Sequence, residues 1–179
     1  MLIDKDKFTK WIDEQHASLF KHAFWMTGNR ALAEDLVQET FYQAWKSRHD
    51  IENEDNPLPW LLTVLRRQVY KEYQQTRLDT LALSEQHIDV HIGGSDNLTE
   101  VNLDTLLDLG TGLMSLSTRQ RELMLLHGLH GFTYDQIAEQ LGIPIGTVMS
   151  RISRARQALR AFYTNSESDK VIVPFRKRN

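Results

Sequence analysis

The chain has no cysteine among its 179 residues, and only four prolines and nine glycines. The absence of cysteine excludes disulfide bridges and metal sites built on thiolates, and it is typical of a reducing compartment. No apolar run approaches the roughly 20 residues that a transmembrane helix needs. The first residues, MLIDKDKFTK, also lack the apolar segment of a secretion signal. We therefore expect a soluble, cytoplasmic protein.

Basic residues are missing from one part of the chain and concentrated in another. Residues 1–77 carry 11 Lys or Arg against 12 Asp or Glu, whereas residues 78–113 carry no base and seven acids. Residues 114–179 carry ten bases against five acids, although the net charge of the chain is −3. Such segregation indicates modules with different partners, and a basic module is suited to the phosphates of nucleic acid.

Apolar residues recur at helical spacing through residues 1–77 and predict a domain of three helices. The first spans residues 5–27. The second runs from Arg30 to about Arg48 with Asn29 as its N-cap, and the third runs from Trp60 to about Gln75 after Pro59. Three amphipathic helices with short connections predict a small bundle.

The region after this bundle lacks sustained periodicity. Residues 78–97 are acidic and predict a flexible linker, residues 98–165 a second domain, and residues 166–179 a tail whose role the sequence does not decide. No segment alternates as a strand does. The predicted fold class is therefore all-α, with two small helical domains joined by a flexible acidic linker.

Helix-start signals recur in the second domain. A leucine-rich helix is expected to end at Gly110. Ser117 and Thr133 each precede a glutamine by three residues, the pattern of a capping box that starts a helix. We expect the first of these helices to reach His127 and Gly128, and the second to end at Leu141–Gly142.

The last predicted helix, from near Gly146, has two different sides. At about 100° per residue, one side carries an apolar stripe and the other carries hydroxyls and arginines. No acid occurs between Gln140 and Ser166. A short helix, a tight turn and a basic helix predict a helix-turn-helix whose second helix enters the major groove of DNA. The apolar stripe comprises Val148, Ile152, Ala155, Leu159 and Phe162.

Two blocks of sequence resemble the extracytoplasmic-function (ECF) sigma factors of bacterial RNA polymerase. The block AEDLVQETFYQAW, Ala33 to Trp45, is similar to the segment of that family that binds the core polymerase. The block LSTRQRELMLLHGLHGFTYDQIAEQLGIPIGTVMSRISRARQALR is similar to the domain that recognises the −35 promoter element. The chain departs from the family's pattern at KEYQQTR, where a more basic ending is common, and at Leu116-Ser117, where Leu-Pro is usual.

The resemblance implies roles for three groups of residues. Contacts with core polymerase are expected from Asp35, Gln38 and Glu39. Contacts with the −10 element are expected from the third helix and the loop before it, at Arg66, Arg67, Tyr70, Lys71, Asn53 and Asn56. Contacts with −35 bases are expected from Thr147, Ser150, Ser153 and Arg154, and contacts with phosphates from Arg119, Arg151 and Arg156.

The resemblance also implies that the protein is not an enzyme, because the polymerase performs the chemistry. It implies an anti-sigma factor as a further partner. The sequence predicts no cofactor and no metal site, since the pairs His87/His91 and His127/His130 lack further ligands nearby. Two other classes stay open from the residues alone: an autonomous helix-turn-helix regulator, and an adaptor whose basic helix binds an acidic protein.

Overall fold

The computed structural model describes residues 5–48, 55–80 and 103–169. Those ranges contain seven α-helices and no strand, which confirms the all-α prediction. The chain divides into two compact units, Met1–Thr99 and Glu100–Asn179, here called the N-terminal and C-terminal units. Most of the predicted linker, most of the predicted tail and most of the loop His49–Asn56 lie outside the described residues. Residues 78–80 of the predicted linker and 166–169 of the predicted tail are helical, so both adjoining helices are longer than the sequence predicted.

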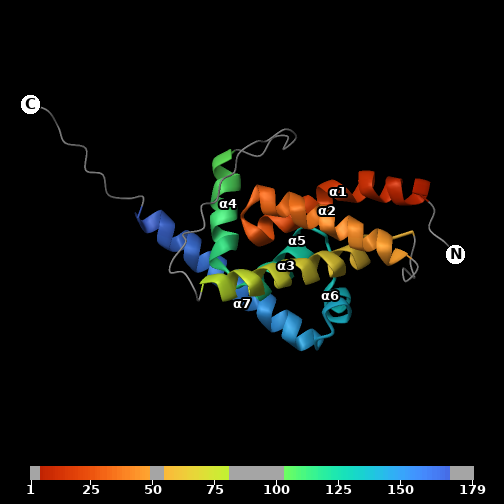
Figure 1. Ribbon diagram of the computed structural model, residues 1–179. Helices are drawn as coiled ribbons and strands as arrows, with labels where there is room; N and C mark the ends of the chain where they lie inside the picture. The colour runs from red at the N-terminus through yellow and green to blue at the C-terminus, as the bar shows by residue number, and fades with distance from the viewer. Residues whose placement is uncertain (1–4, 49–54, 81–102, 170–179) are drawn as a thin grey trace, which may run out of the picture. The chain divides into compact units, whose positions relative to one another are not determined.

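The N-terminal unit contains the helices α1 (Lys5–Thr27), α2 (Arg30–Lys46) and α3 (Leu58–Thr80), which pack against one another (Figure 1). Gly28 adopts a φ of 68°, a left-handed conformation that lets the chain reverse between α1 and α2. Asn29 then caps α2, because its side chain accepts the backbone N–H of Leu32 at 3.0 Å. The predicted cap is confirmed.

Each helix of this unit contributes residues to one apolar core. The Tyr73 hydroxyl on α3 donates a hydrogen bond to the backbone carbonyl of Met26 on α1, which joins the two helices through a polar contact. At one end of the core, Phe8 packs edge-on against Phe41 and Trp45. The most deeply buried apolar side chains are Leu19, Ala23, Ala33, Val37, Ala44, Leu61 and Leu65.

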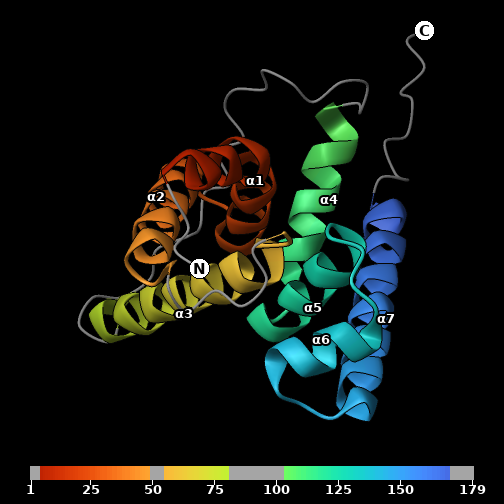
Figure 2. The ribbon, with the colours of Figure 1, turned by 90° about the vertical axis from the view of Figure 1, so that its right-hand side faces the viewer.

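The C-terminal unit contains α4 (Leu103–Ser115), α5 (Thr118–Gly128), α6 (Tyr134–Leu141) and α7 (Ile145–Asp169). Helix α7 runs along the other three and contacts each of them (Figure 2). Both predicted capping boxes are confirmed. The Gln120 side chain accepts the N–H of Ser117 at 3.2 Å, and the Gln136 side chain accepts the N–H of Thr133 at 2.9 Å.

The prediction that the leucine-rich helix ends at Gly110 is wrong, since α4 continues to Ser115. Glycine serves here in packing. A Cβ atom at Gly112 would lie 2.5 Å from the Tyr163 hydroxyl oxygen and 3.3 Å from the Leu159 Cδ2 atom, so a larger residue would force the Tyr163 side chain to move. Helix α5 ends at Gly128, as predicted, and Gly131, with a φ of 70°, follows in the connection to α6.

A buried arginine holds the end of α4 against α5. The guanidinium of Arg121 donates to the carbonyl oxygens of Leu113, Met114 and Leu116, at 2.8, 3.0 and 3.1 Å. The last carbonyls of a helix lack partners within the helix, and Arg121 supplies donors to them from the neighbouring helix. This contact fixes the connection between the two helices.

Candidate nucleic-acid interface and docking surfaces

The helix-turn-helix consists of α6, a tight turn and α7. Gly142 ends α6 in the left-handed conformation, with φ 63° and ψ 38°, and the N–H of Ile143 donates to the carbonyl of Ala138 at 3.1 Å. These are the features of a glycine-terminated helix. The carbonyl of Pro144 accepts the N–H of Thr147 at 2.8 Å and starts the next helix. Three residues therefore reorient the chain from α6 into α7.

The N-terminal half of α7 has one buried and one exposed side. Val148, Ile152 and Ala155 are at most 1% exposed, whereas Leu159 and Phe162 are half-buried where the helix passes the end of the unit. The predicted orientation of this helix is confirmed. The side opposite the core carries the exposed side chains Ser150, Ser153, Arg154, Arg156 and Gln157, with Thr147 and Arg151 half-buried at its edge.

The structure brings six of the seven predicted −35 residues together on α7. The seventh, Arg119, is exposed in the first turn of α5. Two exposed apolar side chains on α7 were not among the predicted site residues: Ile145 and Met149, which are 41% and 52% exposed. The sequence shows that these two residues lie one helical turn apart, but only the structure shows that they are exposed and do not belong to the core.

The predicted −10 residues of α3 share one side of that helix. Arg66 lies over the Tyr70 ring, 5.1 Å from its centroid, while Arg67 and Lys71 are exposed. At about 100° per residue these four side chains centre on the side opposite the buried Leu61, Leu62, Leu65 and Val69, while the buried Val64 lies at the edge, next to Lys71. Asn56 is exposed just before α3, and Asn53 lies outside the described residues.

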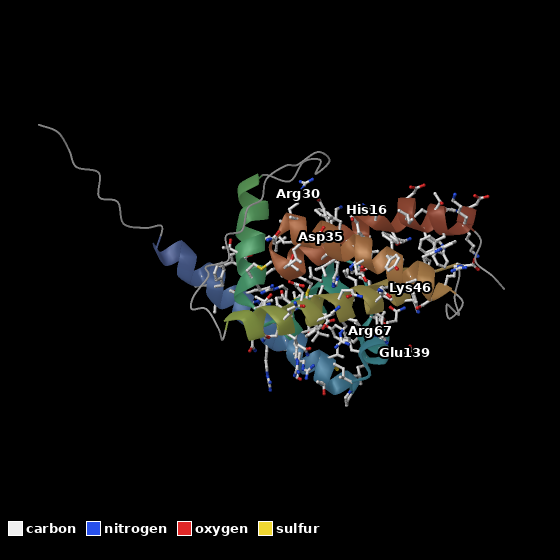
Figure 3. The ribbon with its side chains drawn as sticks, viewed as in Figure 1. His16, Arg30, Asp35, Lys46, Arg67 and Glu139 are labelled. Carbon is white, nitrogen blue, oxygen red and sulfur yellow. The ribbon has the colours of Figure 1, made fainter. Side chains whose placement is uncertain are left out.

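The outer side of α2 is acidic and carries one aromatic ring. Asp35, Gln38 and Glu39 are all exposed, with Asp35 in the first half of the helix and Lys46 at its end (Figure 3). Tyr42 lies one turn after Glu39 and is 55% exposed. The Lys46 amine is 5.1 Å from the centroid of its ring. Tyr42 was not among the predicted site residues, although its position at i+7 from Asp35 places it on the same side of the helix.

The histidines of the C-terminal unit lie at the connection between α5 and α6. The Nδ1 atom of His127 is 2.9 Å from the carbonyl oxygen of Phe132, and its ring packs on Tyr134. Burial lowers the pKa of His130 from 6.5 to about 4. Within the described ranges, no three His, Asp or Glu side chains form a group that could hold a metal ion. His87 and His91 lie outside those ranges.

Known protein families match both units. Residues 11–78 match sigma-70 region 2, and residues 106–159 match sigma-70 region 4. The first match contains α2 and most of α1 and α3, and the second contains α6, the turn and α7 as far as Leu159. These matches define the class of the chain: it carries the two conserved regions of a sigma-70 protein.

Individual relatives narrow the class. The ECF RNA polymerase sigma factor SigL of Mycobacterium tuberculosis is 34% identical over 149 residues, which cover 83% of this chain and 84% of SigL. EcfG of Rhodopseudomonas palustris is 29% identical over 153 residues, which cover 85% and 83% of the two chains. The chain therefore belongs to the ECF RNA polymerase sigma factors, which direct transcription initiation and are not enzymes.

A solved structure agrees with this assignment. The sigma factor RpoE from Bartonella quintana, in complex with the anti-sigma factor NepR, superposes with a TM-score of 0.78 at 30% sequence identity. The match covers 90% of this chain and 98% of that one. Among the helices described, none combines the length and apolar character that a membrane crossing needs.

Proposed function

We propose that the outer side of α2 docks this sigma factor on core RNA polymerase. Asp35, Gln38 and Glu39 present two carboxylates and an amide to solvent. Glu39 accepts a hydrogen bond from Gln43 at 2.6 Å, and Glu34 pairs with Arg30 at 3.0 Å. No cation in the described part of the chain lies within ion-pair distance of Asp35, so its carboxylate is available to a basic partner.

The basic side of α3 faces the −10 element in this proposal. Melted DNA is held by a positively charged groove and by rings on which bases stack. Arg66, Arg67 and Lys71 supply the charge, and Tyr70 supplies a half-buried ring beside Arg66. Asn53 and Asn56 would contact the same element from the preceding loop.

The exposed side of α7 contacts the −35 element. Thr147, Ser150, Ser153 and Arg154 carry the donors and acceptors that recognise base edges in a major groove. Arg119, Arg151 and Arg156 then bind the flanking phosphates. The observation that carries this assignment is the division of α7 into a buried apolar side and an opposite side of exposed hydroxyls and arginines.

A chain of net charge −3 is poorly suited to bind DNA alone, because phosphate neutralisation dominates such affinity. Docking on polymerase would compensate for this weak affinity for DNA, because tethering raises the effective concentration of each unit at the promoter element that it contacts. We place the protein in the cytoplasm with the polymerase and the promoter. The domains proposed are residues 1–77, 98–165 and the linker 78–97 between them. The complex of RpoE with NepR supports an anti-sigma factor as an additional partner.

Charge reversal at Asp35 tests the docking surface. Asp35→Arg should weaken binding of the full chain to core polymerase at least tenfold, because it opposes the charge that a basic partner recognises. Asp13→Arg is the matched control, since Asp13 is an exposed acid on α1 outside the proposed surface. Affinity is measured by fluorescence anisotropy of the labelled chain. Equal affinities for the two variants would remove α2 from the interface.

Truncation of Arg154 tests the contact with the −35 element. Arg154→Ala should cost about 1–3 kcal/mol at one base of that element. Transcription by the reconstituted holoenzyme from promoters with single substitutions measures the preference. Arg160→Ala is the control, since Arg160 is exposed on the same helix outside the proposed contacts. An unchanged preference at every −35 base would contradict the assignment.

Transcript starts distinguish a sigma factor from an autonomous regulator. Holoenzyme made with this chain should initiate at sites that core polymerase alone does not use. The purified chain alone should bind the same promoters weakly. Tight binding by the chain alone to two symmetric half-sites would favour the regulator.

A further inference from the structure

Two apolar side chains interrupt the polar surface of α7. Ile145 and Met149 are 41% and 52% exposed, and they lie one turn apart, so their side chains are neighbours on the helix. Single exposed apolar residues are common on protein surfaces. Here, however, the pair lies in the first two turns of the helix that enters the DNA groove, where each solvent-facing side chain has a potential partner.

The pair is continuous with the residues proposed to contact bases. Ile145, Met149 and Ser153 follow one another at intervals of four residues, and Ser153 is about 40° from Met149 around the helix axis. Arg156 and Arg160, both exposed, border the same strip one and two turns further along. The strip thus begins with two apolar side chains and ends among hydroxyl and guanidinium groups.

The surroundings of the pair favour DNA over a protein as its partner. No acidic residue occurs between Gln140 and Ser166, and the guanidinium of the bordering Arg156 attracts phosphates. In the major groove the one prominent apolar group is the C5-methyl of thymine, which proteins recognise by apolar contact. A methionine side chain is flexible and polarisable, so it can adapt to the position of such a methyl group.

We propose that Met149, supported by Ile145, packs against the C5-methyl group of a thymine in the −35 element and thereby contributes to promoter specificity. This inference rests on the assignment of α7 to that element. The contact selects thymine over uracil and cytosine at one or two positions, in addition to the hydrogen bonds of Ser150, Ser153 and Arg154.

Uracil substitution removes the methyl group and leaves base pairing intact. The experiment uses holoenzyme reconstituted from the full chain, after transcript starts have located its promoter. Each thymine of the −35 element is replaced singly by uracil, and promoter affinity is measured for the wild type and for Met149→Ala. For the wild type, at least one position should lose about fourfold in affinity, the equivalent of one methyl group removed from an apolar contact.

The Met149→Ala variant should bind the thymine and uracil promoters equally at that position, whereas Met149→Leu should retain part of the preference. Leu129→Ala is the matched control, since Leu129 is 38% exposed at the end of α5 and outside α7. It should keep the full thymine preference. Circular dichroism establishes that each variant is folded.

Three results would overturn the proposal. The first is a uracil effect of equal size in the wild type and Met149→Ala at every position. The second is a uniform loss for Met149→Ala on all templates together with weaker binding to core polymerase, which would make the pair a protein contact. The third is retention of every −35 preference by Arg154→Ala, which would remove α7 itself from the element. If Arg154→Ala loses its preference but no uracil effect depends on Met149, only the methyl contact is refuted.

Discussion

Replacement of Arg121 by methionine should destabilise the C-terminal unit by about 3 kcal/mol. The guanidinium donates to three carbonyls at the end of α4, and the side chain is buried. Methionine keeps an unbranched apolar stem of similar reach but cannot donate. The bonds to Leu113 and Leu116 are buried, and each bond of a charged donor contributes at least about 1.5 kcal/mol. The bond to Met114 is partly exposed, so water can replace it.

Tryptophan fluorescence allows unfolding of the N-terminal unit to be followed separately. All four tryptophans lie in the N-terminal unit, so their fluorescence reports that unit alone, while far-ultraviolet circular dichroism reports both. In urea, the transition of the C-terminal unit should move about 2 M lower for Arg121→Met, taking a slope of about 1.5 kcal/mol per M. The fluorescence transition should stay in place.

Arg119→Met is the matched control, because Arg119 is an exposed arginine on the same helix. Its effect should stay within about 0.5 kcal/mol, as for most surface substitutions. If Arg121→Met and Arg119→Met gave the same transition, the three hydrogen bonds would contribute no net stability. If fluorescence and circular dichroism shifted together, the two units would not unfold independently.

Three further predictions concern packing, pH and docking. Gly112→Ala should destabilise the C-terminal unit by about 1 kcal/mol, because its methyl group would meet the Tyr163 hydroxyl, even though alanine favours a helix. In a Tyr163→Leu background the same substitution should be neutral or stabilising, and thermal unfolding measures both effects. Burial lowers the pKa of His130 to about 4, so the unfolded chain binds a proton first as the pH falls. The free energy of unfolding should therefore decrease as the pH falls from 6.5 to about 4, by on the order of 1 kcal/mol because the ring is only partly buried. The decrease should be smaller in His130→Asn. Tyr42→Ala should weaken binding to core polymerase about tenfold and Tyr42→Phe much less, as for an aromatic residue at an interface; equal losses would contradict a role for the ring.

Local signals in the sequence predicted the helix starts and the sharp turn correctly. Asn29, Ser117 and Thr133 each satisfy backbone or side-chain groups within three residues, so the neighbouring sequence determines the geometry. Gly142 likewise acts on the turn in which it lies. The apolar stripe of α7 was predictable for the same reason, since its period is a property of one helix.

Contacts between distant segments were not predictable in this way. The sequence predicts a helix end at Gly110, because glycine commonly ends helices. The close approach of Tyr163 to Gly112, 51 positions earlier in the chain, becomes visible only in the packed unit. Met149 and Tyr42 were overlooked for a related reason: an apolar residue at helical spacing is ambiguous until its exposure is known. The roles of the candidate residues toward polymerase and DNA stay predictions.

The length of α7 has a mechanical consequence. Fourteen residues, about 21 Å of helix, separate Tyr163 from Met149, and both belong to one continuous α-helix. A tilt of about 5° about the contact with Gly112 would displace the end proposed to contact DNA by about 2 Å, enough to break a hydrogen bond to a base edge. If α7 recognises the −35 element as proposed, the packing of Tyr163 on Gly112 would influence promoter recognition from the opposite end of that helix.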